Sequence, residues 1–213
     1  MGAFHNHDHE HDHEDGQFTG LSDTYKRRLW AVIAINAAMF FVEMTAGQLG
    51  RSQALQADAL DFLADSLTYG ISLAAIGAAL RTRANVALLK GLSLSAMGLW
   101  VFGSTLYRVF VVGVPEAEVM GAVGFLALVA NVASVVLLIA YKDGDANVRS
   151  VWLCSRNDAI GNVAVIIAAA GVWGTATGWP DLIVAAIMAG LFLSSSFQII
   201  TRALHERRVA NAA

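Results

Sequence analysis

The sequence has few charged residues for its length. Asp, Glu, Lys and Arg make up 15% of the 213 residues, whereas they make up about 25% of a typical soluble domain. Hydrophobic residues make up 56% of the chain, and the mean hydropathy is +0.56. A soluble protein cannot cover so much apolar surface with so few charges, because its core must be surrounded by polar side chains. The composition therefore indicates an integral membrane protein.

Other features are also scarce. The single cysteine, Cys154, excludes an intramolecular disulfide bond. The two prolines, Pro115 and Pro180, fall in breaks between apolar segments, and so few prolines argue against a disordered proline-rich chain. The net charge of −3 provides no basic surface for nucleic acid. None of the apolar segments contains a Walker-type glycine loop for phosphate binding.

Six apolar segments are present, each close to the ~20 residues that a membrane-spanning helix needs. They cover residues 29–49, 54–80, 88–112, 117–141, 150–175 and 180–201. We therefore predict an all-α integral membrane protein with six transmembrane helices. The predicted organisation is a disordered His-rich and acidic tail over 1–24, a six-helix domain over 25–205 and a short C-terminal tail over 206–213.

The distribution of basic residues predicts the orientation. Basic residues are enriched on the cytoplasmic side of membrane proteins, and here eleven fall on the side that holds both termini: Lys26, Arg27, Arg28, Arg81, Arg83, Lys90, Lys142, Arg149, Arg202, Arg207 and Arg208. The opposite loops carry Arg51 and Arg108. We therefore expect both termini to be cytoplasmic, in the plasma membrane (the inner membrane of a prokaryote).

Two predicted spans carry polar pairs with the same spacing. Asp61 and Asp65 are four residues apart in the second span, and Cys154 and Asp158 are four residues apart in the fifth. On a helix this spacing places both side chains of a pair on one face, one turn apart. Four ligands from two helices would form a tetrahedral site with three oxygens and one sulfur, which suits Zn²⁺ or Cd²⁺.

A passive role for these acids is energetically unfavourable. An aspartate at the centre of a span costs about 2.5–3.5 kcal/mol on insertion scales. No lysine is expected in the middle of any span to neutralise Asp61, Asp65 and Asp158. The alternative interpretation is a set of protonated carboxyl groups that hydrogen-bond to neighbouring helices.

Further polar residues in the spans have open interpretations. Asp58 fits a proton relay and a solvated acid at a helix end equally well, and Glu43 in the first span is ambiguous. Three amides are more typical of hydrogen bonds between helices than of metal ligands: Asn36, Asn131 and Asn162.

The N-terminal tail alternates histidine with carboxylates. Imidazole suits zinc, copper and nickel, so we expect weak auxiliary chelation by His5, His7, His9, His11 and His13. A solvated polar tail without metal binding is the alternative.

The segments ADALDFLADSLTYGISL and CSRNDAIGNVAV resemble those of the cation diffusion facilitator family, as do the six-span layout and Pro115 before the span that contains Asn131. This resemblance implies a homodimer that exchanges divalent metals, often zinc, for protons. Family ligands on the second span match Asp61 and Asp65, and on the fifth span Asp158 matches while Cys154 takes the place of His or Asp.

Two departures from the family pattern are visible. Cys154 would shift selectivity toward softer ions such as Cd²⁺, or Asn157 or a water molecule would complete the ligand shell instead. Most members also carry a cytoplasmic ferredoxin-like domain, whereas this sequence ends near the last span, as in a short form. A dimer would then rest on membrane helices, where small residues offer close packing: Ala186, Gly190 and Ser194.

The predicted function is proton-coupled efflux of divalent metal, Zn²⁺ or Cd²⁺, by alternating access in a secondary-active transporter that is not an enzyme and needs no cofactor. A membrane metal sensor or binding subunit without transport is the main alternative. An intramembrane metal-dependent enzyme is disfavoured, because residues 58–65 contain neither the glycines nor the arginine that such enzymes place around their acids.

Overall fold

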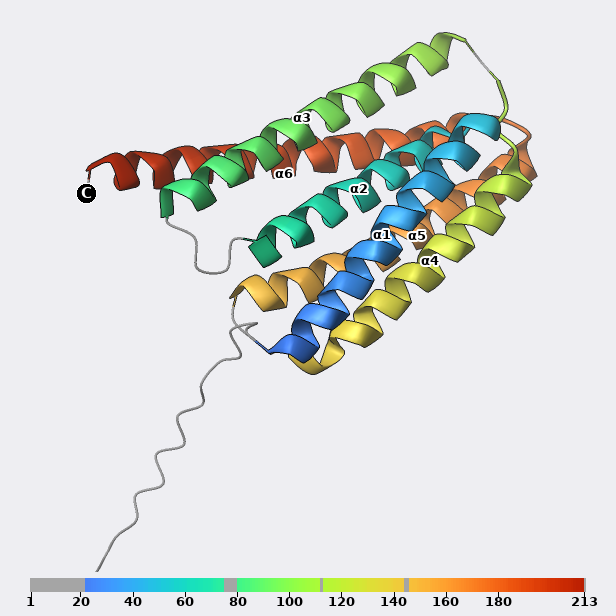
Figure 1. Cartoon of the computed structure of the whole chain (residues 1–213). Coiled ribbons are helices and arrows are strands. Elements are labelled where there is room, and N and C mark those ends of the chain that lie inside the picture. The colour runs from blue at the N-terminus through green and yellow to red at the C-terminus, as the bar shows by residue number, and fades with distance from the viewer. Residues whose placement is uncertain (1–21, 75–79, 112, 144–145, 213) are drawn as a thin grey trace, which may run out of the picture.

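The computed structural model describes residues 22–74, 80–111, 113–143 and 146–212, and these fold into a bundle of six α-helices (Figure 1). The helices are α1 (Asp23–Leu49), α2 (Gln53–Ala74), α3 (Leu80–Phe110), α4 (Ala117–Leu138), α5 (Ala146–Thr175) and α6 (Trp179–Ala212), with a 3₁₀ turn, η1 (Ile139–Tyr141), after α4. The predicted all-α fold is confirmed. Residues 206–212 continue α6 rather than forming a separate segment. The proposed chelating histidines of the tail, His5 to His13, lie outside the described residues.

Five of these helices are long and apolar enough to cross a membrane: α1, α3 from Ala87, α4 with η1, α5 from Val151, and α6 to His205. The second predicted span, α2, is not among these five within the described residues, and it carries three acids, Asp58, Asp61 and Asp65. These acids do not exclude α2 from the bundle, since α2 contacts each of the other five helices. It is the central element of the fold.

Helices α1, α2, α4, α5 and α6 converge at one end of the bundle, and the helices spread apart toward the other (Figure 1). We call the first the closed end; it holds the α1–α2, α3–α4 and α5–α6 connections. The second, the open end, holds the start of α1 and the end of α6. Helices α3 and α6 pack along each other, as do α4 and α5, and toward the open end the α3–α6 pair diverges from α1, α4 and α5 (Figure 1).

The distribution of side chains is inverted relative to a soluble protein. Large apolar residues are exposed on the outside of the bundle, among them Phe41, Trp100, Phe125, Trp173 and Phe197. Buried positions instead include many polar residues: Asn36, Glu43, Asp58, Asp65, Asn131, Asn162 and Asp181. Apolar side chains facing outward and polar groups facing a bundle interior are the arrangement expected in lipid.

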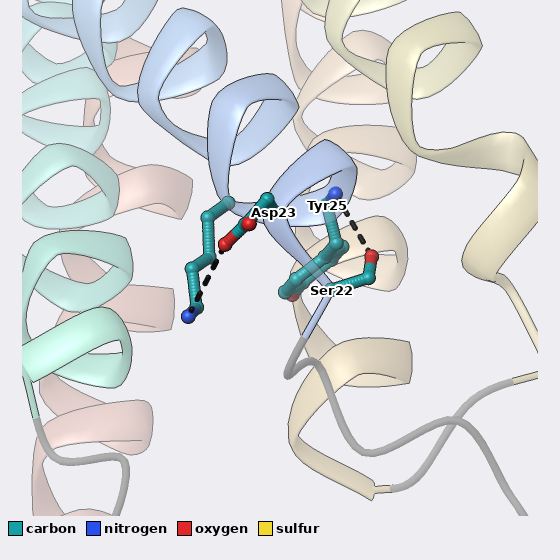
Figure 2. A network of polar contacts seen from close by, with 4 residues as sticks. Ser22, Asp23 and Tyr25 are labelled. Carbon is teal, nitrogen blue, oxygen red and sulfur yellow. Dashed lines mark hydrogen bonds and ion pairs between the residues drawn. The ribbon is translucent and has the colours of Figure 1, made fainter.

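A local cap defines where α1 begins at the open end. The Ser22 Oγ accepts a hydrogen bond of 3.2 Å from the backbone N–H of Tyr25, and Asp23 in the first turn lies 3.8 Å from the Lys26 ammonium group (Figure 2). A side-chain oxygen that accepts from the third residue of a helix satisfies one of its free N–H groups. The first described residues are thus a structured helix start.

A buried carboxylate joins α6 to α2 at the closed end. Asp181, in the first turn of α6, accepts hydrogen bonds from Ser52 Oγ (2.6 Å), Gln53 N (2.8 Å) and Ala54 N (3.0 Å). An acidic group at a helix N-terminus satisfies free N–H groups and interacts favourably with the helix dipole. Because Asp181 caps a helix other than its own, it holds the two helices together at this end.

Candidate metal centre

A cavity of about 390 Å³ lies between α2, α3, α5 and α6. All four predicted metal ligands line it, so the structure brings the two sequence pairs to one place. The lining residues are Asp61, Ala64, Asp65, Thr68, Lys90, Leu94, Cys154, Asn157, Asp158, Met188, Leu191, Phe192, Ser195 and Ile199. From Asp61 and Met188 the cavity extends along α2 and α6 in the direction of the open end.

The carboxyl groups of α2 and α5 face one another. Asp158 lies within hydrogen-bonding reach of both Asp61 and Asp65, and its Oδ2 is buried without a hydrogen-bond partner. Two carboxyl groups can share a hydrogen bond only when one of them carries a proton. Across the described part of the chain, no three His, Cys, Asp or Glu side chains already stand at metal-binding spacing. The three carboxyl groups therefore lie close together without forming a preassembled ligand cluster among the described residues.

Tyr69 orients one of these carboxyl groups. It lies four residues after Asp65, hence on the same face of α2, and is fully buried. Its hydroxyl donates a hydrogen bond to Asp65 Oδ2, and the backbone carbonyl of Val151 on α5 lies 3.5 Å away. A hydrogen bond to a ligand carboxylate fixes its position for a metal ion. Tyr69 was not among the predicted site residues, although its four-residue spacing from Asp65 is visible in the sequence.

Both candidates for the fourth ligand line the cavity. Cys154 is half-buried, one turn from Asp158 toward the open end, and it interacts electrostatically with Asp65. Asn157 also lines the cavity, but it is exposed and its amide oxygen accepts a hydrogen bond of 3.2 Å from Arg156 Nη2. The geometry therefore leaves Cys154 and Asn157 as alternatives.

One basic residue of the predicted cytoplasmic side, Lys90, also contributes to this cavity. No lysine was expected in the middle of a span, and Lys90 lies near the start of one. In the structure α3 begins at Leu80, so Lys90 lies about three turns inside the helix and within its apolar stretch, which starts at Ala87. It is half-buried and lines the cavity together with Asp65 and Cys154. The acids opposite Lys90 offset the cost of its burial.

A second buried polar cluster lies on the closed-end side of this cavity. Asn162 on α5 donates a 2.6 Å hydrogen bond to Asp58 Oδ2 on α2 and accepts one of 2.9 Å from Asn131 on α4. The predicted role of Asn131 and Asn162 in joining helices is confirmed. Asn36 instead donates to the carbonyl of Val32 in its own helix, at 2.8 Å.

The two acids of uncertain role, Asp58 and Glu43, both belong to this cluster. Asp58 is 2% exposed and Glu43 is 0% exposed, so neither is a solvated acid at a helix end. No space large enough for a water molecule lies between this cluster and the carboxyl groups of Asp61, Asp65 and Asp158. The metal cavity is thus closed on the side that faces the closed end.

Residues 29–206 match the family of the cation efflux transmembrane domain, and the chain belongs to this family. It is 27% identical over 205 residues to the metal cation efflux system protein CzcD of Cupriavidus metallidurans, covering 91% of this chain and 61% of that protein. It is 28% identical over 197 residues to the zinc transporter ZitB of Pectobacterium atrosepticum, covering 84% and 60%. The match to ZitB of Escherichia coli is 27% over 200 residues, covering 86% and 63%. The chain thus spans about three fifths of the length of these relatives.

The first prediction concerns Tyr69. In Tyr69→Phe, Asp65 loses the hydrogen bond that orients it, and we expect zinc affinity to fall by about tenfold, as when a ligand loses its hydrogen-bonding partner. Isothermal titration of the detergent-purified protein measures this change. Tyr107→Phe, at an exposed tyrosine of α3, is the matched control and should bind zinc as the wild type does. Equal affinity in both variants would contradict the role of Tyr69.

Proposed function

We propose that the protein exports divalent metal ions, Zn²⁺ in the first place, across a membrane in exchange for protons. The observation that carries this proposal is the position of two ligand pairs, Asp61 with Asp65 and Cys154 with Asp158, around one cavity between four helices. That cavity extends toward one end of the bundle and is blocked by a dry polar cluster toward the other. Access from one side at a time is what alternating access requires.

In this proposal all six helices, including α2, cross the membrane, and the open end is cytoplasmic. Basic residues support this orientation. They cluster at the open end in the first turns of α1, after η1 and in the last turns of α6: Lys26, Arg27, Arg28, Lys142, Arg202, Arg207 and Arg208. The closed end carries Arg51 and Arg108. The site would then take metal from the cytoplasm, with the protein in the plasma membrane.

The chemistry of the ligands couples metal to protons. Carboxylates and a thiol bind metal only when deprotonated, so an ion that enters from the cytoplasm releases protons there. The α3–α6 pair then closes against α1, α4 and α5 at the open end, and the closed end opens. Protons from outside return to Asp61, Asp65 and Asp158 and displace the ion. A metal sensor would share the same ligands without this movement, so flux separates the two functions.

The second prediction tests transport through this site. In proteoliposomes with an imposed pH gradient, wild-type protein should accumulate zinc in proportion to the gradient, and Asp65→Asn should abolish accumulation because a neutral amide replaces a charged ligand. Asp143→Asn, at an exposed acid of the open end, is the matched control and should transport normally. Zinc binding without uptake by the wild type would favour a sensor. Wild-type flux in Asp65→Asn would remove Asp65 from the site.

The third prediction decides the fourth ligand. Thiolate is a softer ligand than oxygen and favours cadmium. If Cys154 binds the ion, Cys154→Ser should weaken cadmium binding by about tenfold and zinc binding less. Asn157→Ala should then change neither. The reverse pattern, weaker zinc binding only in Asn157→Ala, would assign the position to Asn157. Competition between the two ions on the purified protein measures both effects.

The fourth prediction concerns assembly. We propose a homodimer through the membrane face of α6, where Ala186, Gly190 and Ser194 are exposed and a side chain at Gly190 would meet nothing in its own chain. Small residues let helices approach closely in lipid. The detergent-solubilised protein should have twice the 22.6 kDa chain mass in light scattering, and Gly190→Leu should shift it to the monomer. A monomeric wild type would contradict the proposal.

A further inference from the structure

The cavity contains one charged group that the proposed mechanism does not use, the ammonium group of Lys90. It approaches from α3, whereas the acids come from α2 and α5. The described residues include no ion pair between Lys90 and an acid within 4.0 Å. Lys90 still interacts electrostatically with Asp65 and Cys154. It therefore acts on the cavity through its charge and not by blocking one carboxylate.

The surroundings keep this charge on the acidic side. The α6 wall of the metal cavity is uncharged and consists of Met188, Leu191, Phe192, Ser195 and Ile199. On its other side Lys90 borders a groove of about 190 Å³ between α2 and α3, lined by Ala64, Leu67, Ile71, Leu89, Ser93, Leu94 and Met97. An ammonium group gains no solvation among apolar side chains. The ammonium group of Lys90 is therefore more stable when it faces the carboxyl groups.

Lys90 reduces the negative charge of the cavity by one. Three carboxylates, Asp61, Asp65 and Asp158, contribute −3 when deprotonated and Lys90 contributes +1, which leaves −2, or −3 when Cys154 binds as a thiolate. Without the lysine, the cavity would carry one more negative charge in either case, which would hold a divalent ion more tightly in the low dielectric of the bundle.

We propose that Lys90 is the resident counter-charge of the metal cavity, which weakens divalent-metal binding and so lets the bound ion leave during transport. The inference rests on the proposed function, because it concerns the same site. It makes Lys90 a residue that sets affinity through its charge, without being a ligand. A lysine suits this role, since its ammonium group is a cation that cannot itself coordinate a metal ion.

The fifth prediction tests this role by titration of zinc into the full-length protein in detergent. Removing the charge in Lys90→Met should tighten zinc binding by about tenfold, because repulsion between an ammonium group and a divalent ion is lost. In proteoliposomes the same variant should have a lower maximal rate of zinc flux, since release becomes slow. Lys90→Arg, which keeps the charge, should bind and transport close to wild type.

Two further variants complete the test. Lys90→Gln repeats the charge removal with a polar side chain, in case Lys90→Met does not fold. Lys26→Met removes a positive charge at the open end, outside the cavity, and should leave affinity unchanged. Unchanged or weaker zinc binding in both Lys90→Met and Lys90→Gln, or equal changes in Lys90→Arg, would overturn the proposal. Zinc binding without flux in the wild type would overturn transport alone, and the affinities would still decide the role of Lys90.

Discussion

The mutual approach of carboxyl groups from α2 and α5 is the constraint on which the rest of the structure depends. Asp61, Asp65 and Asp158 come together inside a bundle whose outer surface is apolar, where unpaired charge is expensive. The neighbouring groups reduce this cost in different ways. Tyr69 donates a hydrogen bond to Asp65, and Lys90 supplies a positive charge across the cavity. In the proposed function a divalent ion would complete the compensation, and the unfavourable environment of the acids would then favour metal binding.

The fold places this acidic centre where the bundle changes from tightly packed to separated. At the closed end, Asp181 of α6 caps α2, and Ala54, Leu55 and Met120 form a buried apolar cluster with α5. At the open end, the α3–α6 pair diverges from the other helices (Figure 1). Because α2 contacts every other helix, a shift of the α3–α6 pair against α2 would reach the metal centre directly. The cavity extends toward the end where this pair diverges, while α1, α2, α4 and α5 stay packed there around a buried apolar cluster that includes Tyr25 and Val151.

Two side chains would give the proposed metal site its particular chemistry. Cys154 brings a soft sulfur atom to a cavity that otherwise offers carboxyl and amide oxygens, and Lys90 brings a positive charge to a site built to attract cations. As a ligand, Cys154 would favour softer metals, and in our proposal Lys90 would limit how strongly any divalent ion is held. Selectivity and release would therefore be set by different helices, α5 and α3.

The sequence by itself determined the class of fold and the pairing of candidate ligands, because both depend on local periodicity. Apolar segments of membrane-spanning length predict helices wherever they pack, and residues four apart share a helix face in any helix. Only the tertiary structure decided where each face points. How each helix is rotated against its neighbours decides several features of the site. It buries Asp58 and Glu43, brings Asn162 to Asp58, and places Lys90 opposite Asp65. That rotation arises from packing between segments distant in sequence, such as α3 with α6, and no local pattern encodes it.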